Sequence, residues 1–167
     1  MLNSKLTSLE SFPRIILQTI NGHIIELTNH SLISDWTMVI IYRGHHSKNC
    51  TEFLNLLNSF HQQFADIGIT IIAASADNRE QLQQHLKKLT VSFPIACELS
   101  VEHMYQLNLH LSMPKDFHET NHPFAEPALF IVDEQSQIVL SDIANNPYTR
   151  PNLDLLLSGL TELKSQS

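Results

Sequence analysis

Two continuous apolar runs of strand length lie on either side of a segment with helical periodicity. The runs are residues 38–42 (Met-Val-Ile-Ile-Tyr) and 69–75 (Ile-Thr-Ile-Ile-Ala-Ala-Ser), and such runs are typical of strands buried on both faces of a sheet. Between them, from Ser47 to about Ile67, apolar residues recur at three- and four-residue steps, and Gly68 is expected to end this helix. The pattern predicts a β-α-β unit with parallel strands.

The rest of the chain adds further elements to this unit. Asn21-Gly22, between two short apolar runs, predicts a hairpin over 14–27 with a tight two-residue turn, because this dipeptide readily supplies two positive φ angles. Asp77 is expected to cap a second helix, and Pro151 stands at a tolerated first-turn position of the last one. The other expected elements are helices over 78–89, 100–109 and 151–163, a short extended piece over 93–97, and an antiparallel pair of strands over 128–132 and 138–140.

Residues 110–126 show neither a helical nor a strand period, which predicts a long loop, and loops of this length are usually functional. Residues 1–13 have mixed polarity and are expected to form a short arm. Without an internal repeat, linker or low-complexity tract, residues 1–167 are read as a single domain. The element order predicts an α/β three-layer sandwich with a central mixed sheet and an N-terminal hairpin, an order common in thioredoxin-like folds.

Composition narrows the functional classes. The net charge of −7 argues against nucleic acid or an anionic membrane surface as the main partner. No stretch approaches the roughly 20 apolar residues that span a bilayer, and the N-terminus lacks the pattern of a secretory signal. The chain has two cysteines, Cys50 and Cys97, which is too few for a disulfide framework. These observations favour a cytoplasmic protein.

The passage from the first apolar run into the long helix is the candidate site. Residues 43–47 (Arg-Gly-His-His-Ser) interrupt the apolar pattern just before the helical period begins. A helix start exposes backbone N–H groups and the positive end of the helix dipole, which suits an anion or a thiolate. Cys50 lies three residues after Ser47, about one helical turn further along the same face.

Several short segments, taken in order, resemble one protein family. Residues 42–50 resemble the Tyr-Arg-Gly-x-Trp-Cys-Pro-x-Cys signature of peroxiredoxin-like proteins in the alkyl hydroperoxide reductase/thiol-specific antioxidant (AhpC/TSA) family. Further matches in order are 75–77 (Ser-Ala-Asp), 93–94 (Phe-Pro), 127–133 (Pro-Ala-Leu-Phe-Ile-Val-Asp) and 148–151 (Tyr-Thr-Arg-Pro). The resemblance implies a thioredoxin-like fold and a thiol peroxidase, with peroxide as substrate, a thiol reductant and a homodimer as partners, and no cofactor.

The chain departs from the signature where the chemistry is expected. In this alignment the first cysteine of the signature, the peroxidatic nucleophile, falls on Ser47, and only the second remains, as Cys50. A serine hydroxyl ionises far less readily than a thiol and is not oxidised to a sulfenic acid. The resemblance therefore implies peroxidase activity that is weakened or lost. Because three signature positions differ, natural divergence is favoured over a single engineered substitution.

Several residues are candidates for the site. If turnover occurs, Cys50 is the expected reactive thiol, with Arg150 supplying charge and Ser47 helping to bind a peroxide oxygen; alternatively, Cys50 is an inert buried thiol. The substrate pocket is expected to contain Arg43, Gly44, His46 and Pro127. The resemblance also implies a cis peptide bond at Pro127, facing the active-site turn; the plain alternative is a proline that opens a strand.

Two other functions stay open at this stage. The first is a binding module that keeps the scaffold without catalysis. The second is metal handling by His45, His46, His118 and His122, joined by Cys50, Glu119 or Glu126, since the loop before Pro127 can approach the turn in this fold. The histidine spacing fits no known metal signature, so solvated loop histidines and no metal are the plain expectation. Cys97 is expected in the core, and a Cys50–Cys97 disulfide stays open.

Overall fold

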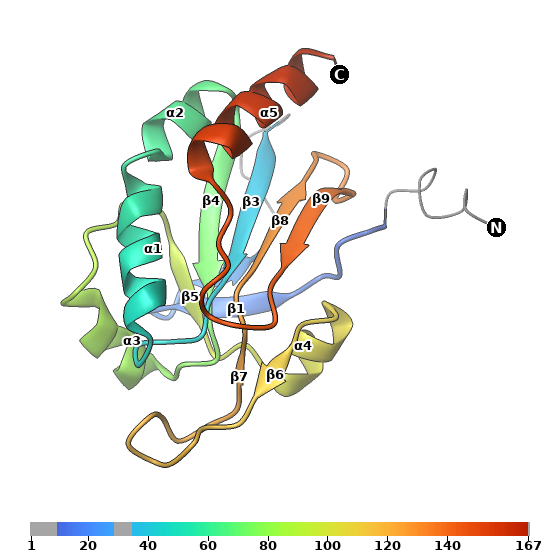
Figure 1. Cartoon of the computed structure of the whole chain (residues 1–167). Coiled ribbons are helices and arrows are strands. Elements are labelled where there is room, and N and C mark those ends of the chain that lie inside the picture. The colour runs from blue at the N-terminus through green and yellow to red at the C-terminus, as the bar shows by residue number, and fades with distance from the viewer. Residues whose placement is uncertain (1–9, 29–34, 167) are drawn as a thin grey trace.

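The computed structural model describes residues 10–28 and 35–166 (Figure 1). Its centre is a seven-stranded mixed sheet in the order β2-β1-β5-β4-β3-β8-β9. The strands are β1 (Ile16–Thr19), β2 (Ile24–Glu26), β3 (Trp36–Ile41), β4 (Ile69–Ala74), β5 (Ile95–Cys97), β8 (Ala128–Val132) and β9 (Ile138–Ile143). β3 pairs in parallel with β4 and antiparallel with β8, which confirms the predicted β-α-β unit and the mixed sheet.

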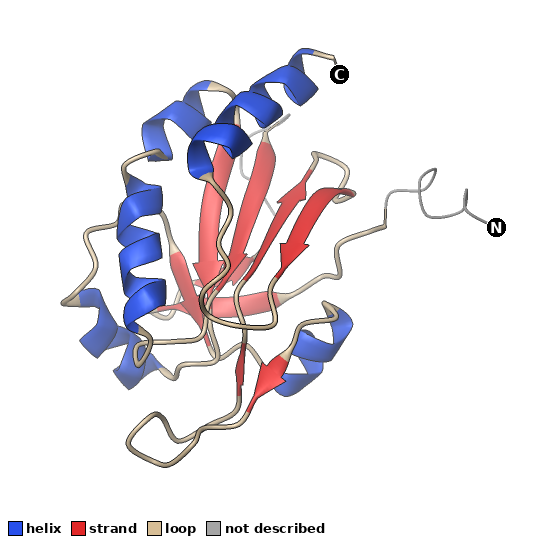
Figure 2. Cartoon of the chain, viewed as in Figure 1, coloured by secondary structure: helices blue, strands red, loops and turns tan. Residues whose placement is uncertain are grey.

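Helices cover both faces of this sheet, so the molecule has three layers (Figure 2). They are α1 (Lys48–Asn58), α2 (His61–Asp66), α3 (Arg79–Leu86), α4 (Val101–Gln106) and α5 (Leu153–Ser165). Side chains alternate along β3: Met38 and Ile40 pack in the core beneath α1, α2, α3 and α5, whereas Val39 and Ile41 pack in the core shared with α4. Burial on both faces explains why β3 is apolar from Met38 to Ile41.

The N-terminal hairpin forms as predicted, with one change in its turn. β1 and β2 pair antiparallel at the edge of the sheet, and the Thr19 N–H donates to the carbonyl of His23, which closes a three-residue loop. Within it, Gly22 has φ +78° and Asn21 does not have a positive φ. The predicted two-residue turn is therefore wrong, since a single left-handed glycine closes a longer loop. Residues 10–12 run beside the β8–β9 turn, and the rest of the predicted arm lies outside the described residues.

The long helix expected from Ser47 to Ile67 is two helices. α1 ends at Asn58, where the Ser59 backbone N–H and hydroxyl both donate to the carbonyl of Leu56. A side chain that competes for helical carbonyls in this way favours a helix end. α2 then begins at His61 and stops before Gly68, whose φ of +76° confirms the predicted glycine stop.

Two helix starts differ from prediction by one residue. Asn78, not Asp77, caps α3: its side chain accepts the Gln81 N–H, and the Gln81 side chain accepts the Asn78 N–H in return. The Asp77 side chain instead forms hydrogen bonds with His45 and His122. Asn152 caps α5, so Pro151 precedes the cap and does not stand in the first turn.

The predicted loop 110–126 contains a small hairpin. β6 (Leu111–Ser112) pairs with β7 (Phe124–Ala125), and β7 leads through Glu126 and Pro127 directly into β8. The peptide bond before Pro127 is trans, so the cis-proline prediction is wrong. The chain continues from one strand into the next without reversing, and the extended conformation that proline favours in the preceding residue suits this path.

Candidate active site

The turn between β3 and α1 is shaped by one glycine and one serine. Gly44 has φ +140°, and a Cβ at this position would lie 2.6 Å from Asp77 Oδ1. Only glycine therefore allows the Asp77 carboxylate to approach the turn. Ser47 is the N-cap of α1, and its hydroxyl accepts the Cys50 backbone N–H at 3.3 Å. The predicted helix start at residue 47 is confirmed.

Cys50 lies in the first turn of α1 with its sulfur between two donors. The Arg43 backbone N–H donates to Sγ at 3.4 Å, and Arg150 Nη2 lies 3.3 Å from the same atom. Donors on both sides, together with the helix start, are the surroundings that stabilise a negatively charged sulfur. The side chain is fully buried, with an exposed fraction of 0%.

Arg150 is held in place from the far end of the chain. Its Nε donates to the carbonyl of Pro147 at 3.2 Å, and its guanidinium lies over the Phe53 ring at 5.2 Å. A cavity of about 300 Å³ lies between α1 and the segment that carries Arg150, lined by Asn49, Glu52, Phe53, Leu56, Pro147, Tyr148, Arg150 and Pro151. Pro127 lines a second, much smaller hollow together with Arg150 and Phe53. Two predicted site residues, Arg150 and Pro127, are thus neighbours.

Arg43 ties the turn to the 110–126 segment. Its side chain forms ion pairs with Glu126 (Nε–Oε2, 3.1 Å) and Glu119 (Nη2–Oε1, 3.5 Å), and its guanidinium lies 4.6 Å from the centre of the Phe124 ring. Ser112 donates a hydrogen bond of 2.7 Å to the other oxygen of the buried Glu126 carboxylate. The prediction that this loop approaches the turn is therefore confirmed.

Asp77, predicted from the sequence to cap a helix, is a fully buried carboxylate at the centre of a histidine cluster. Its Oδ2 accepts the His45 backbone N–H at 2.7 Å, and its Oδ1 lies 3.2 Å from both His45 Nδ1 and His122 Nε2. Burial opposes its ionisation, but the hydrogen bonds from His122 and His45 outweigh burial, so the pKa of Asp77 lies below its usual value. The hydrogen bond to Asp77 in turn raises the pKa of His122.

His46 and His118 differ in burial and in their contacts. The His46 ring packs 4.6 Å from the Phe124 ring, and both of its nitrogens are buried. Burial, reinforced by the charge of Arg43, lowers the pKa of His46 to about 4, so the ring is neutral near pH 7. His118 is exposed and stacks beside Phe117, and the described contacts place it with no other predicted site histidine.

A further buried histidine, His85, supports α1 and was not predicted. The Thr51 hydroxyl donates to the carbonyl of Ser47 and lies 2.8 Å from His85 Nε2. Since the Thr51 proton is used, His85 is assigned as the donor through Nε2. Burial lowers the pKa of His85 to about 4. Nothing in the local sequence of α3 marks this histidine, because its partner lies on another helix.

Cys97 lies in β5, in the same core as Cys50, and both thiols are free. Its sulfur donates to the carbonyl of Gln18 at 3.4 Å, and burial followed by the nearby Glu98 charge raises its pKa. The predicted core position is confirmed, and the open alternative of a Cys50–Cys97 disulfide is not formed here.

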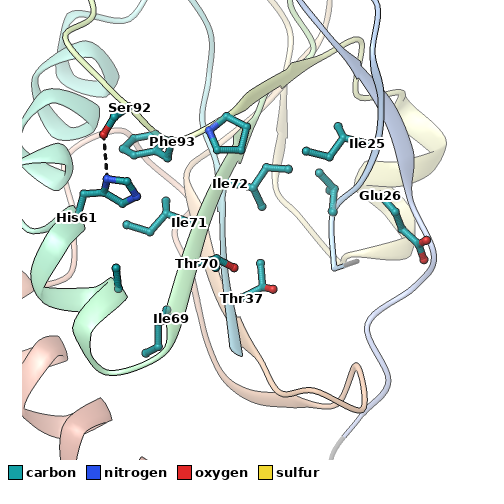
Figure 3. Close-up of a pocket in the computed structure, with 13 residues that line it drawn as sticks. Ile25, Glu26, Thr37, His61, Ile69, Thr70, Ile71, Ile72, Ser92 and Phe93 are labelled. Carbon is teal, nitrogen blue, oxygen red and sulfur yellow. Dashed lines mark hydrogen bonds between the residues drawn. The ribbon is translucent and has the colours of Figure 1, made fainter. Parts of the chain in front are cut away.

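A separate apolar groove of about 310 Å³ runs over β4 and α2 (Figure 3). Its walls include Ile69, Ile71 and Ile72, and at its rim Ser92 is hydrogen-bonded to His61. None of its lining residues is among those that surround Cys50 or Asp77. Within residues 10–28 and 35–166, no helix is long and apolar enough to span a bilayer.

Comparison with known proteins places this chain in a family. The model of the AhpC/TSA family matches residues 9–141. A relative from Medicago truncatula, described as a 1-Cys peroxiredoxin, is 24% identical over 169 residues, which cover 97% of this chain and 75% of the relative. The chain belongs to the AhpC/TSA family, as its sequence resemblance implied.

Solved structures show the same architecture. A mutant of peroxiredoxin 6 from Arenicola marina superposes with a TM-score of 0.74 at 20% identity, covering 94% of this chain and 73% of that one. A peroxiredoxin-like protein from Aquifex aeolicus gives 0.75 at 12% identity, covering 95% and 88%. Mycobacterium tuberculosis AhpC gives 0.73 at 17% identity, covering 97% and 95%. The thioredoxin-like, peroxiredoxin-type fold is thereby confirmed.

Proposed function

We propose that this protein is a thiol peroxidase that uses Cys50 as its one reactive thiol. Family membership and the Medicago truncatula relative described as a 1-Cys peroxiredoxin support this reading. The observation that carries it is the pair of donors on the Cys50 sulfur, the Arg43 N–H and the Arg150 guanidinium. Such donors stabilise a thiolate and the negative charge that moves onto a peroxide oxygen as it is attacked.

The proposed reaction balances with one peroxide and two equivalents of an external thiol. The Cys50 thiolate attacks the terminal oxygen of a hydroperoxide, the O–O bond breaks, and the products are the sulfenic acid of Cys50 and an alcohol or water after proton uptake. A first thiol then displaces water from the sulfenic acid to give a mixed disulfide. A second thiol resolves this disulfide and restores Cys50.

In this proposal Ser47 has a structural role and is not the remnant of a lost nucleophile. Its hydroxyl caps α1 and orients the helix start at which Cys50 sits. The sequence alignment that put the nucleophile at residue 47 instead implied weakened or lost activity. The two alternatives make opposite predictions for Ser47→Cys: a gain of activity if position 47 is the nucleophile's place, and no gain if Cys50 fills that role.

Peroxide consumption with dithiothreitol as reductant tests the proposal. Wild-type turnover that disappears in Cys50→Ala and persists in Cys97→Ala is the expected result. Wild-type turnover that survives in Cys50→Ala would overturn it. Turnover that appears only in Ser47→Cys would restore the sequence alignment.

The complete burial of Cys50 favours a second candidate, a scaffold that binds a partner without catalysis. Because the side chain is fully buried, a peroxide reaches the sulfur only if the groups around it, Arg150 among them, move aside. Wild-type protein that consumes no peroxide, and whose Cys50 reacts with iodoacetamide only after unfolding, would establish this candidate.

We also propose that the protein forms a homodimer and works in the reducing cytoplasm. Large apolar side chains lie exposed around Pro151: Leu56 and Tyr148 line the cavity beside Arg150, and Leu155 lines a neighbouring one. Exposed apolar groups gathered in this way favour contact with another protein surface. Sedimentation of the wild type as a dimer, and of Leu155→Lys as a monomer, is the expected result; a monomeric wild type would exclude it.

A further inference from the structure

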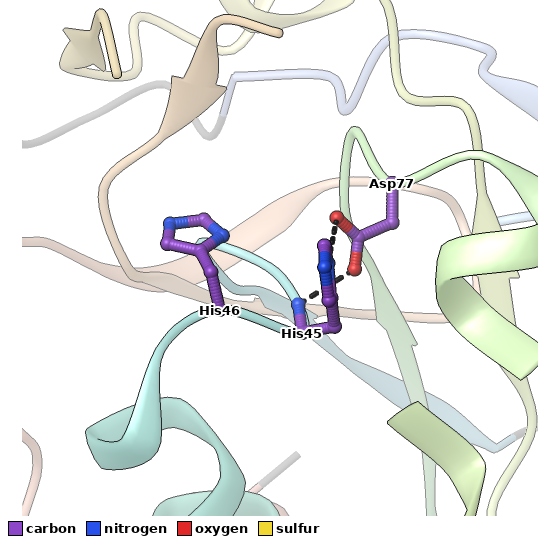
Figure 4. A group of neighbouring side chains, drawn as sticks. All are labelled: His45, His46 and Asp77. Atoms are coloured by element: carbon purple, nitrogen blue, oxygen red, sulfur yellow. Dashed lines mark hydrogen bonds and ion pairs between the residues drawn. The ribbon is translucent and has the colours of Figure 1, made fainter. Parts of the chain in front are cut away.

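Three potential ligand atoms converge on the turn that precedes α1 (Figure 4). One ring nitrogen each from His45 and His46 and one carboxylate oxygen of Asp77 lie within 4.8 Å of one another. His45 Nδ1 and Asp77 Oδ1 are 3.2 Å apart. The two imidazoles come from adjacent positions of the turn, and Asp77 comes from the loop after β4.

These separations fit a small metal ion. In a tetrahedral zinc site with bonds of about 2.0–2.1 Å, neighbouring ligand atoms lie about 3.3–3.4 Å apart. The His45–Asp77 pair is already near this separation. The His46 nitrogen reaches it by closing at most about 1.5 Å of ligand–ligand distance.

Both nitrogens of the His46 ring are buried, and neither has a hydrogen-bond partner. Buried polar atoms in proteins are nearly always paired, so two unpaired nitrogens on one ring call for an additional partner. No hydrogen bond has to break for this ring to turn toward Asp77.

The surroundings of Asp77 supply the outer contacts that metal ligands need. The Oδ2 of its carboxylate is fixed by the His45 backbone N–H at 2.7 Å. His122 donates to Oδ1 from the other side of the cluster. Hydrogen bonds of this kind orient a ligating carboxylate and tune its affinity. Gly44, which leaves room for the carboxylate, completes the support.

The positive charge of Arg43 does not exclude a cation here. Its guanidinium forms ion pairs with both Glu119 and Glu126, so two carboxylates balance this one positive charge. Together with Asp77, the charges near the turn favour a divalent ion.

We propose that His45, His46 and Asp77 form a binding site for a divalent transition-metal ion of the zinc class. Two imidazoles and one carboxylate favour zinc, copper or nickel over calcium and magnesium, which prefer all-oxygen sites. Three protein ligands leave a fourth position for water or another small ligand. Of the histidines considered from the sequence, His45 and His46 remain ligands, His122 supports the added ligand Asp77, and His118 lies outside the site. The proposal does not depend on Cys50 and stands or falls apart from the peroxidase.

Calorimetric titration with Zn²⁺ of the full chain, prepared without a histidine tag and stripped with chelator, tests the site. One equivalent is expected to bind the wild type and to be lost in His46→Phe, which keeps the ring packing on Phe124. His118→Phe, at an exposed position outside the cluster, is the matched control and retains binding. A wild type without saturable binding, or a His46→Phe variant that binds as the wild type does, would overturn the proposal.

Further measurements distinguish this site from a thiolate site and from misfolding. Cys50→Ser is expected to bind Zn²⁺ normally, and Co²⁺ in the wild type is expected to show no thiolate charge-transfer band; the reverse results would contradict the ligand set. His122→Phe removes no proposed ligand; it loses the hydrogen bond that supports Asp77, together with one to the Pro123 carbonyl, and should weaken binding about tenfold to a hundredfold. If circular dichroism shows that His46→Phe is unfolded, His45→Phe is the variant whose loss of binding decides the question.

Discussion

The two cysteines of this chain are equally buried but have opposite surroundings. Cys50 and Cys97 both have an exposed fraction of 0% and belong to the same apolar core. The Cys50 sulfur receives a backbone N–H and an arginine, whereas the Cys97 sulfur donates its proton to the carbonyl of Gln18. One site stabilises a negative sulfur, and the other stabilises the neutral thiol. Burial alone therefore does not distinguish a reactive thiol from an inert one; the direction of its hydrogen bonds does.

The largest expected effect is a difference in oxidation between the two thiols. Under limiting hydrogen peroxide without reductant, Cys50 should be oxidised on the order of a hundredfold faster than Cys97, because two donors on the Cys50 sulfur favour its thiolate, whereas burial raises the pKa of the Cys97 thiol. Peptide mass spectrometry that separates the two cysteines measures this ratio. Equal rates in the folded protein would remove the distinction between the two sites.

Replacement of the arginine should reduce this difference. Arg150→Met keeps much of the side-chain volume over Phe53 but removes the cation from the sulfur. Since a hydrogen bond to a charged group contributes about 1.5–3 kcal/mol, Cys50 oxidation should slow by roughly tenfold or more. Arg14→Met, at an exposed ion pair with Glu26, is the control and should leave the rate unchanged. A normal rate in Arg150→Met would assign the effect to the Arg43 N–H and the helix start.

A pH-dependent stability effect is expected on the Cys50 side. The pKa of His85 is lowered by burial to about 4, so the unfolded chain binds its proton more readily than the folded one. Stability present above the unfolded pKa of about 6.5 is then lost as the pH falls toward 4. From pH 7 to pH 5 the loss from this residue is about 2 kcal/mol.

Urea unfolding at the two pH values, compared between the wild type and His85→Gln, isolates this contribution. Glutamine can donate to Thr51 without titrating, so the variant should lose about 2 kcal/mol less than the wild type between pH 7 and pH 5. The comparison also cancels His46 and His122, which titrate in both proteins. Identical losses would show that His85 is not held neutral by its surroundings.

How far the sequence predicted the molecule depended on the range of the interactions involved. The apolar runs predicted β3, β4 and β8, and Gly68 predicted a helix end, because burial on both faces and a positive φ each leave a local trace. The break at Ser59 was missed because a two-residue interruption does not disturb the helical period. The cis-proline was inferred from the family resemblance and not from local pattern, and the trans bond of the structure contradicts it.

The candidate site was predicted in its location and only partly in its chemistry. Residues 43–50 were identified correctly as a turn into a helix start, but the roles within them depend on distant partners. Arg150 meets Cys50 across 100 positions, and His122 meets Asp77 across 45. The sequence alone favours a helix cap at Asp77, because aspartate is a common capping residue. Its hydrogen bonds with His45 and His122 depend on the fold.

The smallest expected effect comes from replacing the N-cap residues of α1 and α5. Ser47 caps α1 beneath Cys50, and Asn152 caps α5 two positions beyond Arg150 without a hydrogen bond to either cysteine; each side chain accepts the N–H three residues on. Ser47→Ala and Asn152→Ala should each destabilise the protein by about 1 kcal/mol in urea unfolding. Only Ser47→Ala frees the Cys50 N–H and loosens the helix start under the sulfur, so only this variant should also slow Cys50 oxidation, by a few-fold. An equal slowing in Asn152→Ala would mean that Cys50 reports global stability, and the contrast between the two cysteines would then rest on Arg150 and Arg43 alone.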